Sequence, residues 1–221
     1  MVIHTKKQVK TKTIHKRMNL PQSLRDKIDE FWKKQVKVNP NLFNGEVWNV
    51  TKMEENKDNI LLTIEKTDYA HYLYDERHGI EEKYACHNLA GGTYIVTKDG
   101  YAVVGELDDT TSYPRMMQVS GGGIDEKYDI VNGEFDLIKT AKRELKEEIG
   151  VGKIVKTEAI GRISADSGLT SSRTYVYHVE IDRYKGLKNE HEGIKEIIEV
   201  DESELQQMIR NREIEDGFTL G

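Results

Sequence analysis

The order of the strand-like and helical patterns after residue 88 constrains the fold most. Strand-like alternation dominates there, beginning with a hairpin over 91–107. A single helical pattern at 135–149 interrupts the strand-like segments, and a second helix at 202–211 follows the last of them. A doubly wound sheet would require helices to alternate regularly with strands. This order therefore predicts a mixed α/β (α+β) domain of sandwich type.

Residues 1–88 show a different pattern. A helical pattern at 20–36 begins at Pro21, where the missing N–H of proline costs nothing. Two strand-like runs follow at 47–53 and 60–66, separated by turn-forming residues. We therefore predict a small N-terminal strand-and-helix unit at 1–88 and a main domain at 89–221.

Composition and charge exclude several classes of protein. Hydrophobic residues make up 37% of the 221 residues, yet no apolar run reaches the roughly 18–20 residues that span a bilayer. We expect no signal peptide, and because Cys86 is the only cysteine we expect no internal disulfide and a cytoplasmic location. The net charge of −6 argues against general nucleic-acid binding. Six Lys and Arg residues but no acid lie between Met1 and Arg17, where we favour a solvated edge strand or frayed end over a phosphate-binding tail.

The segment "RELKEEIG" at 143–150 places three glutamates near the end of the helix predicted at 135–149. Glu144, Glu147 and Glu148 are three or four residues apart, a spacing that predicts one shared anionic side beside an apolar stripe. Like charges repel there, and the helix dipole disfavours them at a C-terminal end. A bound divalent cation would reverse both effects, and carboxylate oxygens suit Mg²⁺ or Mn²⁺. The alternative is a solvated, salt-bridged helix face.

Three consecutive glycines precede this helix. Gly121, Gly122 and Gly123 follow a strand-like run and allow a backbone to approach a ligand closely. The segment lacks the Gly-Lys-Ser/Thr end of a P-loop and the strand–glycine–helix register of a dinucleotide-binding fold. The three glycines therefore indicate a ligand site only in combination with the glutamates of the helix.

Together, these residues resemble the signature of the Nudix hydrolase family. The second half of that signature is complete, with Arg143, Glu144, Leu145, Glu147, Glu148, Gly150 and Val151. In the first half Ser120 stands where proline is usual. The upstream glutamate should lie six residues after Gly122, but the best candidate, Glu134, lies twelve residues after it. We interpret this difference as an insertion, "EKYDIV", before the helix.

The resemblance implies a Nudix-type α/β/α sandwich and a Mg²⁺- or Mn²⁺-dependent enzyme that cleaves phosphoanhydride bonds. Glu147 and Glu148 would be metal ligands, Glu144 a ligand or the base that orients water, and the carbonyl of Gly121 a further ligand. Gly122 would lie at the substrate. We expect Arg143 and Glu134 to orient the carboxylates.

The remaining sequence resembles the ADP-ribose and nucleotide-sugar pyrophosphatase branch of that family. In this branch an acidic loop before the last strand supplies a further catalytic or metal-binding glutamate, a place that Glu190 and Glu192 occupy here. Gly168 lies where the branch has a substrate loop. Arg115 is expected to bind phosphate, as is Arg162, with a surface role as the alternative for each. The resemblance also implies a homodimer built on the N-terminal unit.

The expected reaction converts a nucleotide sugar, ADP-ribose or a UDP-hexose, to a nucleoside monophosphate and a sugar phosphate. An alternative substrate is a dinucleotide, such as NADH or a diadenosine polyphosphate, or the capped end of an RNA. A second alternative is a non-catalytic sensor that binds a nucleotide sugar. The intact glutamates Glu144, Glu147 and Glu148 argue against the sensor.

Overall fold

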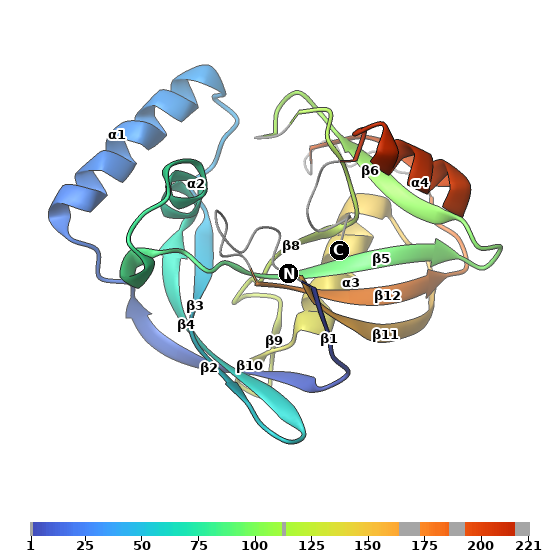
Figure 1. Ribbon diagram of the computed structural model, residues 1–221, viewed down its shortest axis with the longest axis horizontal. Helices are drawn as coiled ribbons and strands as arrows, with labels where there is room; N and C mark the ends of the chain where they lie inside the picture. The colour runs from blue at the N-terminus through green and yellow to red at the C-terminus, as the bar shows by residue number, and fades with distance from the viewer. Residues whose placement is uncertain (1, 112–113, 164–172, 186–192, 215–221) are drawn as a thin grey trace.

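The computed structural model of the protein describes residues 2–111, 114–163, 173–185 and 193–214. Its centre is an eight-stranded mixed sheet (Figure 1). The strands are β1 (Val2–His4), β5 (Leu89–Thr97), β6 (Ala102–Leu107), β7 (Met117–Gln118), β8 (Gly121–Gly123), β11 (Ile154–Ile163), β12 (Arg173–Ile181) and β13 (Ile194–Val200). Their spatial order is β1-β11-β12-β5-β6-β13, with β8 paired to β5 and β7 paired to β6. β12 and β5 run parallel, whereas the other pairs are antiparallel.

Two helices flank this sheet, α3 (Leu137–Ile149) and α4 (Glu202–Arg210). Val103 of β6 belongs to the same hydrophobic core as Leu145 of α3, whereas Val104 packs in a second core with Met208 of α4. Because successive residues of a strand point to opposite faces, the two helices cover opposite sides of the sheet. The predicted mixed α/β class and α/β/α sandwich are therefore confirmed.

The N-terminal residues form a second sheet, with three strands in the order β2-β4-β3, which lies beside the main sheet (Figure 1). Its elements are β2 (Gln8–Arg17), α1 (Gln22–Val38), β3 (Glu46–Glu55), β4 (Asn59–Asp68), α2 (Tyr69–His78) and the short 3₁₀ helix η1 (Glu82–Tyr84). Trp48 of β3 and Leu62 of β4 share one hydrophobic core with Leu89 and Leu145 of the main domain. One continuous core therefore joins the two sheets across the boundary predicted at residue 88.

The helices predicted at 20–36, 135–149 and 202–211 are present, with each end within two residues of its expected place. Helix α2 was not among the elements predicted from the sequence. Asp68 starts this helix by accepting a hydrogen bond from the N–H of His71 at 3.1 Å. His71 and Asp75 lie on its buried side, so the apolar periodicity that predicts a helix is missing.

The polar insertion before α3 folds as a small hairpin. Its strands are β9 (Ile130–Val131) and β10 (Glu134–Phe135). The turn uses Asn132 and Gly133 with φ angles of 52° and 84°, as a two-residue hairpin of the Asn-Gly kind requires. The N–H of Phe135 donates to Thr11 Oγ1 at 2.8 Å, so the insertion is joined to β2.

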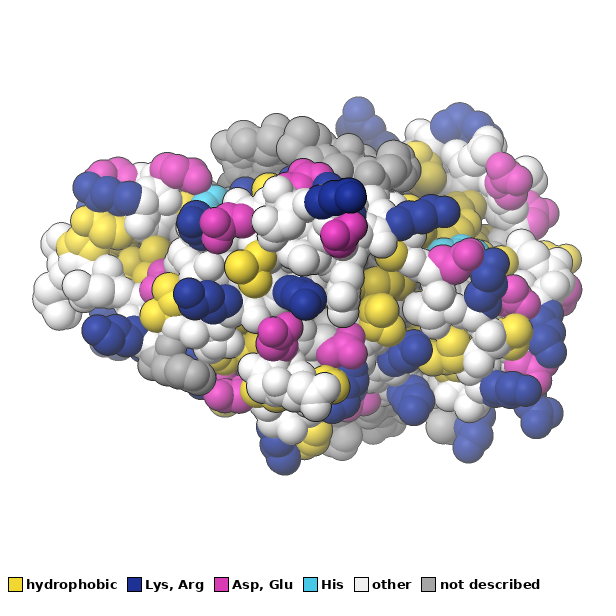
Figure 2. Space-filling view, turned by 90° about the horizontal axis from the view of Figure 1, so that it is seen from below, with side chains coloured by type: hydrophobic (Ala, Val, Ile, Leu, Met, Phe, Trp, Pro, Cys, Tyr) yellow, Lys and Arg dark blue, Asp and Glu magenta, His cyan; other side chains and the backbone are white. Residues whose placement is uncertain are grey.

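The basic N-terminal stretch lies in two edge strands, because β1 ends the main sheet and β2 ends the three-stranded sheet. On the face seen from below, basic and acidic side chains are interspersed and do not gather in one basic field (Figure 2). Edge strands blunted by lysine are a common arrangement, and the edge-strand interpretation of this stretch is confirmed. Among the helices of the described part of the chain, none has the length and apolar character needed to cross a bilayer.

Candidate active site

Helix α3 carries the predicted carboxylates, and local interactions fix both of its ends. The side chain of Asp136 accepts hydrogen bonds from the N–H groups of Ile138 at 2.9 Å and Lys139 at 3.2 Å. Gly150 ends the helix in the left-handed conformation, with φ of 69°. The buried apolar stripe of α3 comprises Leu137, Ala141, Leu145 and Ile149. These contacts set the rotation of the helix and hence the direction of each glutamate.

The glycine strand β8 belongs to the main sheet and contacts α3. It pairs with a second glycine-rich segment, so that Gly121 lies opposite Gly92 and Gly122 opposite Gly91. A Cβ atom on Gly121 would lie 2.8 Å from the carbonyl oxygen of Gly91. A Cβ atom on Gly91 would lie 3.0 Å from the carbonyl oxygen of Leu137. The absence of side chains therefore brings the first turns of α3 and two strands into close contact.

Two of the three glutamates, Glu144 and Glu148, face β8 and are buried. Their exposed fractions are 8% and 6%. Glu148 Oε2 accepts a hydrogen bond from the N–H of Gly121 at 3.1 Å. Glu144 lies against Gly122, where an added Cβ would meet its carboxylate. Because buried carboxylates are costly unless their charge is compensated, this pair has the character of a functional site.

Arg143 connects the acidic residues of α3 to the segment that follows β8. It donates to both carboxylate oxygens of Asp129, from Nε at 3.1 Å and from Nη2 at 2.9 Å, and to the carbonyl oxygen of Gly123 at 3.1 Å. Its Nη1 lies 2.9 Å from both Glu144 Oε1 and Glu147 Oε2. Burial alone would lower the pKa of Arg143, but the hydrogen bond with Asp129 and the charges of Glu144 and Asp129 outweigh burial and raise it. Arg143 is therefore a fixed cation.

We expected Arg143 to hold Glu144 or Glu134; it contacts Glu144, and its most buried acid partner is Asp129 instead of Glu134. Asp129 is completely buried, whereas Glu134 is exposed in β10 and makes no ion pair with a described residue. Sequence reasoning missed Asp129 because the interval was counted from Gly122. Six residues counted from Gly123 reach Asp129, and the inserted hairpin then lies between this acid and α3. The sequence therefore contains an acid at the expected interval, with aspartate in place of glutamate.

Glu144 and Glu147 both contact Arg143 Nη1, but only Glu144 and Glu148 are buried against β8, and the predicted role of Glu147 as a metal ligand stays a prediction. Glu147 is on the neighbouring side of the helix, where its half-exposed side chain contacts Arg143 one turn earlier. Within the described ranges, no three His, Cys, Asp or Glu side chains are grouped so as to hold a metal ion. Glu144 and Glu148 nevertheless form an oxygen-rich pair one turn apart, beside the backbone of Gly121. This donor set is of the kind that Mg²⁺ or Mn²⁺ accepts, because these ions use one or two protein carboxylates and complete their shells with water and phosphate oxygens.

The structure places the other predicted residues as follows. Arg115 is exposed in the turn before β7, with φ of 65°, and pairs with Asp109 at 3.3 Å. Arg162 is buried in β11 and has no carboxylate partner among the described residues. His178 lies in β12, as the alternation of its strand predicted. Gly168, Glu190 and Glu192 lie outside the described residues, so their proposed roles stay predictions.

A hollow of about 570 Å³ borders Arg143 and Glu147 on the outer side of α3. Lys139, Lys142 and Lys146 contribute to its wall. Asp129, Asp136 and Glu147 also line it, so its charge is mixed. Neither Glu144 nor Glu148 is part of its wall, so this hollow is not the space in front of the acidic pair.

Comparison with solved structures finds similarity to a NUDIX hydrolase from Nitrosomonas europaea, with 15% sequence identity and a TM-score of 0.42. The similar region covers 56% of this chain and 78% of that protein. The protein DR0079 from Deinococcus radiodurans has the same identity and TM-score, over 55% of this chain and 72% of its own. No protein-family model and no curated protein matches the sequence. The functional conclusion therefore rests on the residues of the site and not on these structural similarities.

Proposed function

We propose that the protein is a hydrolase that uses a divalent cation to cleave the phosphoanhydride bond of a nucleoside diphosphate linked to another group. The observation that supports this most directly is the buried pair Glu144 and Glu148, packed against a glycine strand. A solvated helix face would leave these carboxylates in water. Arg143 holds Glu144 at 2.9 Å and the N–H of Gly121 holds Glu148 at 3.1 Å, so both carboxylates are fixed side by side, and carboxylate oxygens are the ligands that Mg²⁺ accepts.

In the proposed reaction each residue of the site has its own role. Glu144 and Glu148 would hold the cation and would accept the proton of the attacking water. Arg143 keeps Glu144 in position while Asp129 and the carbonyl of Gly123 fix Arg143. Bound Mg²⁺ would neutralise charge on the phosphate oxygens and lower the pKa of water. Water adds to one phosphorus as the bond to the bridging oxygen breaks, which releases two phosphomonoesters.

The substrate that we propose is a nucleotide sugar, ADP-ribose or a UDP-hexose, with a nucleoside monophosphate and a sugar phosphate as products. This assignment rests on the resemblance of the sequence. A capped RNA end is disfavoured because the basic N-terminal stretch is committed to edge strands and does not extend as a basic arm. Hydrolysis of a dinucleotide would use the same chemistry, so an experiment must distinguish dinucleotides from nucleotide sugars as substrates.

The first experiment measures phosphomonoester release with Mg²⁺ from ADP-ribose, UDP-glucose, NADH, a diadenosine polyphosphate and capped RNA. We expect one of the nucleotide sugars to give the largest kcat/KM. Cleavage of NADH or a diadenosine polyphosphate alone would change the substrate and keep the site. Tight binding of a nucleotide sugar without cleavage of any compound would instead identify a sensor.

The second experiment tests the site with three matched Glu→Gln variants. Glu148→Gln keeps an acceptor for the N–H of Gly121 but removes the charge, so we expect activity to fall by a factor on the order of 100 or more. Glu147→Gln, on the neighbouring side, should lose about tenfold or less. Glu126→Gln, at an exposed ion pair with Lys66, serves as the control. Binding of Mn²⁺, followed by electron paramagnetic resonance, should weaken only when Glu144 or Glu148 is changed. Equal activity of Glu148→Gln and the parent would refute the proposed site.

A further inference from the structure

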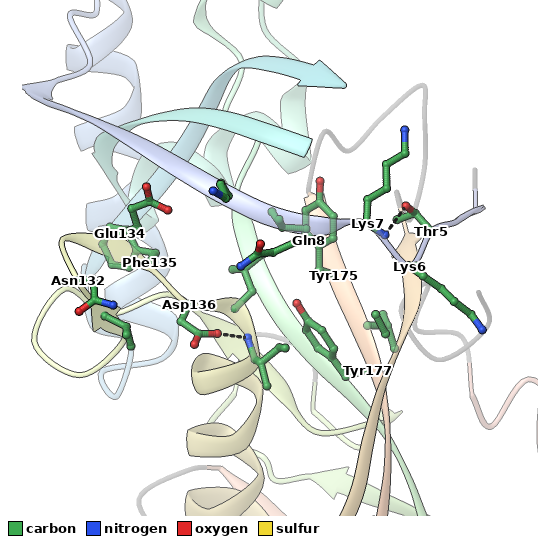
Figure 3. A pocket seen from close by; sticks show the side chains of 18 residues that line it. Thr5, Lys6, Lys7, Gln8, Asn132, Glu134, Phe135, Asp136, Tyr175 and Tyr177 are labelled. Carbon is green, nitrogen blue, oxygen red and sulfur yellow. Dashed lines mark hydrogen bonds between the residues drawn. The ribbon is translucent and has the colours of Figure 1, made fainter. Parts of the chain in front are cut away.

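A second cavity lies beside the first turn of α3. It has a volume of about 530 Å³, within the range of small-molecule sites. β2, the β9–β10 hairpin, the first turn of α3 and strands β11 and β12 enclose it (Figure 3). Glu144, Glu147 and Glu148 are absent from its wall. This cavity is therefore separate from the proposed hydrolytic site.

One tyrosine of β12, Tyr177, supplies its hydroxyl group to this cavity. The Tyr177 side chain is 5% exposed, and its hydroxyl makes no hydrogen bond with a described residue. Figure 3 shows the side chains of Tyr177 and Gln8 directed into the same space. The Tyr175 hydroxyl, in contrast, is buried beside the guanidinium of Arg162. Polar groups of buried side chains are nearly always hydrogen-bonded, so the Tyr177 hydroxyl is available to a ligand in the cavity.

The charges of the wall identify the kind of partner. Burial, and after it the negative charge of Asp136, raises the pKa of Tyr177, so its hydroxyl stays protonated and can donate. Lys6 and Lys10 line the cavity without an ion pair to a described residue, whereas Lys7 pairs with Glu55 at 2.6 Å. The carboxylate of Asp136 is occupied by the first N–H groups of α3. Glu134 also lines the cavity, so three lysines face two acidic residues, a small excess of positive charge that suits an anionic ligand.

The rest of the wall suits a ligand with an organic body. Val9, Phe135 and Ile138 give it apolar surface, and the amides of Gln8 and Asn132 can bond hydroxyl groups. The N-terminal end of α3 adds a positive dipole on the same side as the lysines. An anionic group bound near Tyr177 and Lys10 would leave its uncharged part against these residues.

We propose that this cavity binds a small phosphorylated metabolite, with Tyr177 and Lys10 as donors to its phosphoryl oxygens. The site is independent of hydrolysis at Glu144 and Glu148. Inorganic phosphate and a phosphorylated organic compound share this chemistry, and they differ in their use of the apolar wall.

Isothermal titration calorimetry of the whole protein tests this site. The probes are inorganic phosphate, AMP and ribose 5-phosphate, with adenosine and ribose as uncharged controls. EDTA is present throughout to prevent metal-bridged binding at the carboxylates. We expect one phosphorylated probe to saturate, and the uncharged controls not to bind. Tighter binding of AMP or ribose 5-phosphate than of phosphate identifies the organic ligand, and equal binding identifies free phosphate.

Variants then assign the binding to the cavity. Tyr177→Phe removes only an unpartnered hydroxyl, so the protein should fold, and we expect the Kd to rise about five- to tenfold. Lys10→Met should raise it similarly. The exposed residues Tyr101 and Lys27 provide matched controls, Tyr101→Phe and Lys27→Met, that should bind as the parent does. Saturation by none of the probes would overturn the proposal. So would binding that Glu148→Gln abolishes and Tyr177→Phe leaves unchanged.

Discussion

The carboxylate of Glu144 lies directly against Gly122, so that a Cβ atom on this glycine would come within 2.4 Å of Glu144 Oε1. The contact joins the helix and the strand of the candidate site at one point. Because the neighbouring atom is a charged group 8% exposed, it has little room to move. The glycine therefore fixes where the carboxylate lies, and the pair can be tested by adding a single methyl group.

Gly122→Ala should displace the Glu144 carboxylate and lower kcat more than it lowers stability. We expect at least a tenfold loss of activity, with a cost of about 1–3 kcal/mol in the free energy of unfolding. Gly123→Ala is the matched control, since a Cβ there meets no atom within 4 Å. Steady-state kinetics and urea denaturation measure the two effects. If both variants lose activity equally, the contact with Glu144 is not what matters.

Asp129→Asn should destabilise the protein by about 3–5 kcal/mol, because it breaks a buried ion pair and leaves Arg143 under-compensated. Asp129 is completely buried, and its two bonds hold the guanidinium that contacts Glu144. Glu126→Gln removes a charge from an exposed pair with Lys66 in the same loop and should cost less than about 1 kcal/mol. Urea denaturation at pH 7.5 compares the two. Similar small losses would show that Asp129 contributes no more than a surface acid.

The elements with clear periodicity could be predicted from the sequence, and the contacts between distant segments could not. The apolar stripe of α3 gave the helix its place, and the four-residue spacing of Glu144 and Glu148 put them on one side. Glu147 is more exposed than these two, because it is next to Glu148 and one step along a helix turns the side chain by about 100°.

Contacts between distant segments were out of reach of sequence patterns. The pairing of Asp129 with Arg143 depends on a hairpin folded between them. The cavity beside Tyr177 has its opposite wall in β2, more than 160 residues away.

His71 should make the stability of the protein depend on pH near 6. It is completely buried; its Nε2 donates to the carbonyl oxygen of Tyr84 at 2.9 Å, and Nδ1 accepts from the hydroxyl of Thr67 at 2.7 Å. Burial lowers its pKa from the usual 6.5, although the charges of Asp75 and Asp68 oppose the shift. Below pH 6.5 the unfolded chain therefore binds a proton that the folded protein does not, and stability is lost as the pH falls.

Urea denaturation at pH 7.5, 6.5 and 5.5 checks the dependence on His71. We expect the parent to lose up to about 1.4 kcal/mol per pH unit below pH 6.5 from this group. His71→Gln should be less stable at pH 7.5 and should lack this part of the slope. His78→Gln, at an exposed position of the same helix, serves as the control. Parallel slopes for the parent and His71→Gln would contradict the assignment.

The shared core predicts that the N-terminal unit and the main domain unfold together. Trp48 of β3 packs on Phe135 of β10, with ring centroids 4.8 Å apart, and both are almost completely buried. Phe135→Ala should therefore cost about 3–5 kcal/mol and destabilise both parts equally. Both tryptophans lie within residues 1–88, so tryptophan fluorescence reports on the N-terminal unit and far-UV circular dichroism on the whole chain.

Coincident urea transitions by these two probes, in the parent and in Phe135→Ala, are the expected result. Phe43→Ala provides the control, because the Phe43 side chain is 81% exposed and its loss should change stability by no more than about 0.5 kcal/mol. A fluorescence transition that precedes the circular dichroism transition would show that residues 1–88 unfold on their own. In that case the contact between Trp48 and Phe135 would join two domains of independent stability, and the hairpin inserted before α3 would serve only as their interface.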